Sequence, residues 1–150
     1  MPSRLDSIRG ARVLLVEDNE INRQVAMEIM EYEGFKVDIA ENGEKAIQIL
    51  DKNPDSFDLI FMDLHMPIKD GFSATRELRA DDRFQELPIV AMTADAIVGV
   101  QQQCFDAGMN DYVTKPVNPS ELFAALERWI KSGPKKKSCP MLMYRPVWGG

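Results

Sequence analysis

The chain has 150 residues and a mass of 17.0 kDa, which suits one domain with its own core. With 45% hydrophobic and 28% charged residues it has the composition of a soluble globule, and no apolar run approaches the ~20 residues that cross a bilayer. The N-terminus lacks the apolar core of a signal peptide. We therefore expect a cytoplasmic location without direct membrane contact. The two cysteines, Cys104 and Cys139, indicate neither a zinc site nor a disulfide framework.

The net charge of −6 is unevenly distributed along the chain. Residues 132–150 contribute four positive charges and no acid, so that residues 1–131 carry a net charge of −10. A body this acidic repels nucleic acid and attracts hard cations. We expect no direct nucleic-acid binding.

Five short apolar runs alternate with segments of helical period, which is typical of a parallel sheet covered by helices on both faces. The first, third and fourth runs are almost wholly apolar and are predicted to be central strands, whereas the second alternates like an edge strand. The five runs are residues 13–16, 35–40, 57–62, 87–92 and 111–114.

The segments between these runs show helical spacing. The first repeats apolar residues at Ile21, Val25 and Ile29 and stops at Gly34, a typical C-terminal cap. The fourth contains Gly99, which costs about 1 kcal/mol relative to alanine and makes this helix the loosest of the set. The remaining helices are expected around residues 46–50, 71–79 and 119–130.

Polar side chains follow four of the expected strands. Glu17 and Asp18 follow the first, Asp63 the third, Thr93 the fourth and Lys115 the fifth, and parallel strands end at the same edge of a sheet. Two carboxylates ~4 Å apart repel each other by about 4 kcal/mol at an effective dielectric of about 20. Three in one cleft therefore imply a divalent cation, and oxygen ligands favour Mg²⁺ or Mn²⁺.

Such a cation with few protein ligands keeps waters and recruits a phosphate oxygen. Lys115, as a point charge, and Thr93, as a hydroxyl donor, would complete a pocket for that anion. Asp63 is the best-placed nucleophile, because a metal-neutralised carboxylate can form an acyl phosphate.

Four sequence blocks resemble the signature motifs of the receiver domain of two-component response regulators. They are residues 16–19 (VEDN), 62–71 (MDLHMPIKDG), 92–94 (MTA) and 115–116 (KP). The resemblance covers residues 11–131 and is greatest to receivers of hybrid sensor histidine kinases. It implies an α/β, flavodoxin-like, doubly wound (βα)5 fold with a five-stranded parallel sheet of order 2-1-3-4-5. Residues 1–10 would then be a lead-in and residues 132–150 a flexible, basic and proline-rich tail or linker.

The resemblance also implies roles for the residues around Asp63. Asp63 would accept a phosphoryl group from a phosphohistidine on a histidine kinase or a histidine phosphotransfer domain. Asp18 and Asp63 would bind Mg²⁺ directly, Glu17 mainly through water, and the backbone carbonyl of His65 would be a further ligand. Lys115 would pair with Asp63 and then with the phosphoryl group.

Other residues are implied to relay and tune the signal. Thr93 would move to donate its hydroxyl to the phosphoryl group, and Tyr112 would follow it inward. The side chains of His65 and Asp95 would line the entrance and tune hydrolysis, and the bond before Pro116 would be cis. The added charge would switch the face formed by the fourth helix, the fifth strand and the fifth helix.

Two other classes of function stay open. An aspartate-nucleophile, Mg²⁺-dependent phosphatase would share the metal, the lysine and the threonine, but this chain has no second acid two residues after Asp63 and no cap domain. A non-phosphorylated interaction scaffold would not need every one of these residues. We therefore predict a signalling module without external substrate turnover. The sequence leaves open its cognate kinase, signal and output, phosphoryl lifetime, dimerisation through the switching face, and whether it is free-standing or part of a hybrid kinase.

Overall fold

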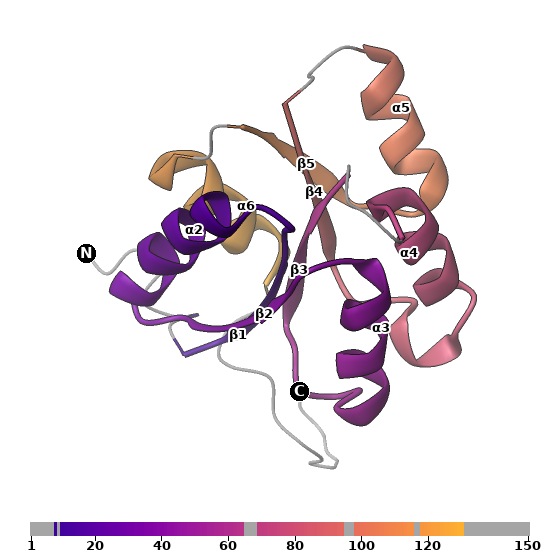
Figure 1. Ribbon diagram of the computed structural model, residues 1–150, viewed down its shortest axis with the longest axis horizontal. Helices are drawn as coiled ribbons and strands as arrows, with labels where there is room; N and C mark the ends of the chain where they lie inside the picture. Colours follow the sequence, from indigo (N-terminus) through magenta and orange to yellow (C-terminus); the bar gives the residue numbers. More distant parts are fainter. Residues whose placement is uncertain (1–7, 9, 65–68, 95–97, 116–117, 131–150) are drawn as a thin grey trace, which may run out of the picture.

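The protein is described here by a computed structural model, which covers residues 8, 10–64, 69–94, 98–115 and 118–130. Five parallel strands form one sheet of order β2-β1-β3-β4-β5, which confirms the predicted topology (Figure 1). β2 lies at an edge, as its alternating pattern predicted, and β1, β3 and β4 lie inside the sheet. The strands are β1 (Arg12–Val16), β2 (Lys36–Ala40), β3 (Leu59–Asp63), β4 (Ile89–Thr93) and β5 (Asp111–Thr114).

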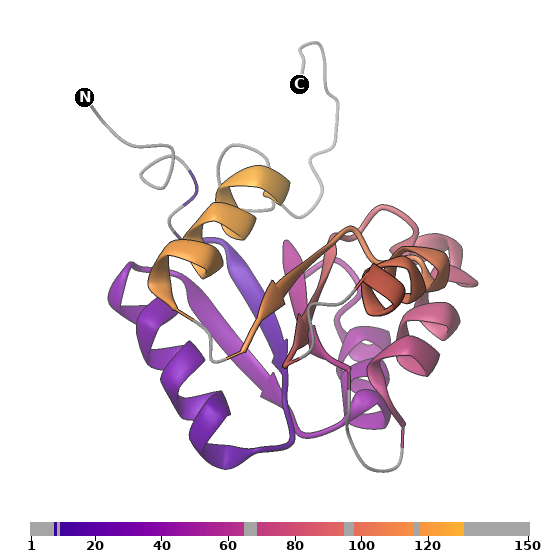
Figure 2. The ribbon, with the colours of Figure 1, turned by 90° about the horizontal axis from the view of Figure 1, so that it is seen from above.

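Helices cover both faces of this sheet. α2 and α6 lie against one face, and α3, α4 and α5 lie against the other (Figures 1 and 2). Within the described residues, no helix is long and apolar enough to cross a membrane. The bounds are α2 (Glu20–Tyr32), α3 (Gly43–Lys52), α4 (Gly71–Arg79), the short 3-10 helix η1 (Asp82–Phe84), α5 (Val98–Ala107) and α6 (Pro119–Trp129).

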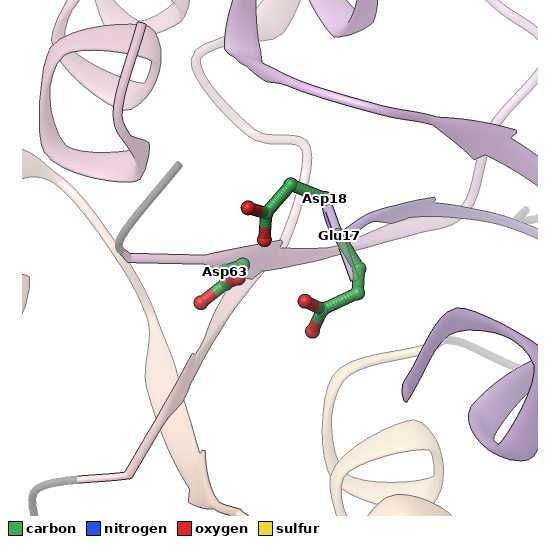
Figure 3. Close-up of side chains that lie close together, drawn as sticks. All are labelled: Glu17, Asp18 and Asp63. Carbon is green, nitrogen blue, oxygen red and sulfur yellow. The ribbon is translucent and has the colours of Figure 1, made fainter. Parts of the chain in front are cut away.

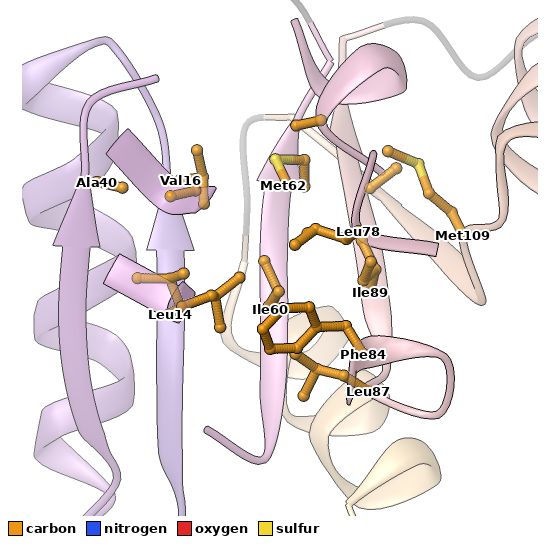
Figure 4. Packing of buried hydrophobic residues seen from close by; sticks show 14 of the residues in the cluster. Leu14, Val16, Ala40, Ile60, Met62, Leu78, Phe84, Leu87, Ile89 and Met109 are labelled. Carbon is orange, nitrogen blue, oxygen red and sulfur yellow. The ribbon is translucent and has the colours of Figure 1, made fainter. Parts of the chain in front are cut away.

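The alternation of strand side chains divides the core into two layers. Leu14 and Val16 of β1 point into the layer under α3 and α4, together with Ile60 and Met62 of β3 (Figure 4). Their neighbours in the chain, such as Leu15, point into the layer under α2 and α6. Because both faces are buried, the central strands are apolar along most of their length, which explains their long apolar runs.

Four α-helices begin at a side-chain cap. Asn19, Asn42, Asp70 and Asn118 each accept a hydrogen bond from the backbone N–H three residues later. This interaction satisfies a donor that would otherwise have no partner within the helix. Each cap therefore fixes the residue at which the helix begins.

The buried face of α2 differs from the stripe that its sequence suggested. Ile21 and Val25 are 72% and 44% exposed, whereas Ala26 and Met30 are buried against the sheet. The two stripes are offset by one residue, which is a rotation of about 100° around a helix with 3.6 residues per turn. The apolar spacing of four therefore located the helix correctly but marked a partly exposed stripe.

Candidate functional site

Three carboxylates meet at the carboxyl edge of the sheet, as predicted. Glu17 and Asp18 directly follow β1, Asp63 ends β3, and these two strands are neighbours in the sheet. One oxygen from each carboxylate lies within 4.8 Å of the others (Figure 3). Glu17 and Asp63 are buried, whereas Asp18 faces solvent. The cluster is therefore closed to solvent at Glu17 and Asp63 and open to solvent at Asp18.

Glu17 is a buried acid with a raised pKa. Burial raises its pKa to about 6, and the charge of Asp63 acts in the same direction. Hydrogen bonds from Lys115 and from the Asn19 backbone N–H, which lies 3.1 Å from Glu17 Oε2, act in the opposite direction. Near neutral pH the site therefore holds a buried carboxylate whose charge a further cation would stabilise.

Lys115, which directly follows β5, forms ion pairs with two of the acids. Its Nζ lies 2.9 Å from Glu17 Oε1 and 3.1 Å from Asp63 Oδ1. Burial alone would lower the pKa of Lys115, but its hydrogen bonds to these two carboxylates raise it above the ordinary value. The ammonium is therefore charged and partly neutralises two buried acids.

Thr93 and Tyr112 lie on the two strands beyond Asp63. In the register of β3 and β4, Asp63 pairs with Met92, so that Thr93 lies one residue further toward the carboxyl edge. Thr93 is buried, and its carbonyl accepts a hydrogen bond of 2.7 Å from the Lys115 backbone N–H. Tyr112 on β5 is half-buried and packs against the layer under α3, α4 and α5.

Several predicted features lie outside the described residues. The carbonyl and side chain of His65, the side chain of Asp95 and the peptide bond before Pro116 are among them, as is the tail of residues 132–150. Their roles stay predictions.

A backbone feature beside Asp63 had no role in the sequence reasoning. The Gly71 N–H donates to the Leu64 carbonyl at 3.2 Å, and a Cβ on Gly71 would lie 2.3 Å from the Asp63 carbonyl oxygen. Glycine is therefore required here by space. In the sequence, Gly71 is marked by its place at the end of the 62–71 block and directly after the N-cap Asp70.

The donor set suits a hard divalent cation. Within the described residues, the cluster offers three carboxylates and no nitrogen or sulfur ligand. Mg²⁺ prefers such oxygen ligands and retains several waters, for which the exposed side at Asp18 leaves access. The residues present therefore fit a magnesium site.

Comparisons with known proteins agree with this geometry. The family model of the response regulator receiver domain matches residues 13–127. The hybrid signal transduction histidine kinase M of Dictyostelium discoideum is 37% identical over 121 residues, which are 79% of this chain and 5% of that protein. Probable histidine kinase 4 of Oryza sativa subsp. japonica is 37% identical over 141 residues, covering 81% of this chain and 14% of that protein. The chain thus spans a small part of the length of these relatives.

Solved structures show the same fold. The receiver domain of sensor histidine kinase PA1611 from Pseudomonas aeruginosa PAO1, with magnesium coordinated in its active site cleft, matches with a TM-score of 0.74 and 40% identity over 80% of this chain and 97% of that one. The receiver domain of Saccharomyces cerevisiae Ssk1, crystallised with the histidine phosphotransfer protein Ypd1, matches with a TM-score of 0.75 and 30% identity over 81% of this chain and 90% of that one. Sequence, fold and carboxylate geometry together place this chain in the receiver domain family of two-component response regulators.

Proposed function

We propose that this receiver accepts a phosphoryl group on Asp63 from a phosphohistidine of a histidine kinase or a histidine phosphotransfer protein. One observation carries the proposal: Asp63 lies within 4.8 Å of two further carboxylates and 3.1 Å from the Lys115 ammonium. A carboxylate with a cation site on one side and an ammonium on the other is suited to attack phosphorus.

The step is an in-line displacement at phosphorus. A carboxylate oxygen of Asp63 forms the new O–P bond, the N–P bond of the phosphohistidine breaks, and its electron pair stays on the imidazole. Glu17 and Asp18, together with Asp63, would hold Mg²⁺, which supplies charge neutralisation for the attacking and transferring oxygens when it is bound. Lys115 would neutralise a further phosphoryl oxygen, and the Thr93 hydroxyl would donate to another. Later hydrolysis of the acyl phosphate returns Asp63 to its starting state, without turnover of an external substrate.

A partner would recognise the phosphorylated state through the face formed by α5, β5 and α6. Thr93 directly precedes the connection to α5, and Tyr112 lies on β5, so both are placed to transmit a change at Asp63. A groove of about 380 Å³ runs along β5 and α6, with Asp111, Glu121 and Arg128 among its lining residues. This groove gives the proposed face a surface on which a partner or a second receiver could bind.

The donor would approach over the start of α2. This helix begins at Glu20, two residues after Asp18, and exposes Ile21 and Val25 on its first two turns. Exposed apolar side chains that adjoin a reactive site are suited to contact with a protein. The Ssk1 receiver, similar to this chain, was crystallised with a histidine phosphotransfer protein.

The unit that carries this function would be residues 11–131, with residues 132–150 as a tail or linker. The described elements from Arg12 to Trp129 and the matched residues 13–127 support this division. The small share of the relatives' length that the chain spans agrees with a receiver that is one module of a larger histidine kinase.

Transfer from a phosphorylated histidine phosphotransfer protein tests the proposal. In the presence of Mg²⁺, label should move to the wild-type chain and not to Asp63→Asn. Ile21→Glu and Val25→Glu should slow this transfer about tenfold, because they place charge in the docking surface. The same variants should react normally with a small phosphodonor, which needs no docking. Label on Asp63→Asn would contradict the acceptor, and equal slowing with both donors would contradict the docking surface.

A further inference from the structure

Helix α3 contributes no side chain to the carboxylate cluster, yet it holds Lys69, which follows Asp63 by six residues in the chain. The Gly43 backbone N–H, at the first residue of α3, donates to the Lys69 carbonyl at 3.1 Å. The Lys69 ammonium lies 3.6 Å from Glu44 Oε1 of the same helix and also contacts the Glu77 carboxylate of α4. Lys69 is therefore attached to α3 through both its backbone and its side chain.

The contact at Gly43 depends on the absence of a side chain. A Cβ at this position would lie 2.7 Å from the Lys69 carbonyl oxygen and 2.9 Å from the Ala74 Cβ. Real Cβ atoms do not approach backbone oxygen this closely, so the segment or the helix would have to move. Gly43 is helical and is not among the glycines with positive φ. Space, and not backbone conformation, therefore accounts for glycine here.

The segment anchored by Gly43, residues 69–71, lies against the end of β3. Its last residue, Gly71, donates its N–H to the Leu64 carbonyl, and Leu64 directly follows Asp63. A Cβ on Gly71 would meet the Asp63 carbonyl oxygen. Displacement of Lys69 would therefore be transmitted through two residues to the backbone of Asp63.

We propose that Gly43 is a positioning residue for the metal and phosphoryl chemistry at Asp63. By leaving room for the Lys69 carbonyl, it fixes residues 69–71 against the backbone of Asp63 and so sets the geometry in which the carboxylates hold Mg²⁺. The inference rests on the proposed function, since it concerns the metal that the carboxylates would bind. It assigns to α3 a part in the reaction that no side chain of this helix performs.

Gly43→Ala tests this inference through Mg²⁺ affinity measured by calorimetry, without phosphorylation. Changes to groups that orient metal ligands typically weaken metal binding by 10–100-fold, and we expect a loss of about tenfold. Gly99→Ala is the matched control, because a Cβ at Gly99 meets nothing within 4 Å and lies in another helix. It should leave the affinity within about twofold of wild type, as surface changes usually do. Equal affinities of Gly43→Ala and wild type would overturn the inference.

A double variant distinguishes the effect of the Lys69 contact on Mg²⁺ affinity from the effect of packing between α3 and α4. Ala74→Gly removes the Cβ that the new side chain at Gly43 would meet, but it leaves the contact with the Lys69 carbonyl. Gly43→Ala combined with Ala74→Gly should therefore bind Mg²⁺ as weakly as Gly43→Ala alone. Full recovery of affinity in the double variant would show that helix packing, and not the anchored segment, determines metal binding.

Amide hydrogen exchange of the wild-type chain tests the same inference even where Gly43→Ala does not fold. Addition of Mg²⁺ should slow exchange at the Gly43 N–H more than at the Lys45 N–H. The acceptor of the latter is Asn42 Oδ1, within the same helix start. Equal slowing at both amides would overturn the inference. Phosphorylation of wild type at Asp63 is measured separately. Failure of the proposed function is then distinguishable from failure of the positioning role inferred for Gly43.

Discussion

The Lys115 ammonium lies 2.9 Å from the Glu17 carboxylate, closer than it lies to Asp63 at 3.1 Å. Both carboxylates are buried, so the lysine offsets charge that would otherwise be costly to desolvate. The same carboxylates are the proposed ligands of Mg²⁺. Under the proposed function, Lys115 would therefore have a structural role before metal binding and a phosphoryl-binding role after transfer.

Lys115→Met should destabilise the metal-free protein by about 3 kcal/mol, because removing one partner leaves two buried carboxylates without their cation. Mg²⁺ should then stabilise this variant more than wild type, since it replaces the missing charge. Urea unfolding with and without Mg²⁺ measures both effects. Lys45→Ala, which removes an exposed lysine on α3, should change stability by less than about 0.5 kcal/mol. A Lys115→Met protein as stable as wild type without metal would contradict this role.

The raised pKa of Glu17 predicts how stability depends on pH without metal. The folded state holds the Glu17 proton up to about pH 6, whereas the unfolded state releases it near the ordinary glutamate pKa of 4.5. The folded state binds more protons between these values, so the free energy of unfolding should fall as pH rises through this interval, by up to about 2 kcal/mol. Glu17→Gln should remove this decrease, and Glu28→Gln, an exposed acid on α2, should keep it. Parallel pH profiles for wild type and Glu17→Gln would be evidence against the raised pKa.

Thr75 on α4 offers a test of the core. Among the described residues, its Oγ1 is the one buried side-chain oxygen or nitrogen atom without a hydrogen-bond partner. Thr75→Val replaces the hydroxyl with a methyl of similar size and should stabilise the protein by about 1 kcal/mol. Thr75→Ser keeps the unpaired hydroxyl, loses the methyl and should be less stable than wild type by about 1 kcal/mol. Thermal unfolding compares the three proteins. A Thr75→Val protein less stable than wild type would contradict the claim that the Thr75 hydroxyl is buried without a hydrogen-bond partner.

The sequence predicted the strand ends because burial on both faces produces long apolar runs, against which a polar residue such as Asp63 stands out. The topology then brings Glu17, Asp18, Thr93 and Lys115 to the same edge. The buried face of α2 was not predictable in this way, since Ile21 and Ala26 are both apolar and only packing decides between them. The Gly43 contact with Lys69 was not predictable either. It joins residues far apart in the chain through the packing of α3 beside α4, and it leaves no local pattern.

The most direct test of the central claim is the intact mass of the chain after incubation with a small phosphodonor and Mg²⁺. The wild-type chain should gain the mass of one phosphoryl group and lose it again after removal of the donor. Asp106→Asn, which changes an exposed carboxyl group on α5, should gain the same mass, whereas Asp63→Asn should gain none. Phosphorylation of Asp63→Asn to the wild-type level would contradict the assignment of Asp63 as the phosphoacceptor.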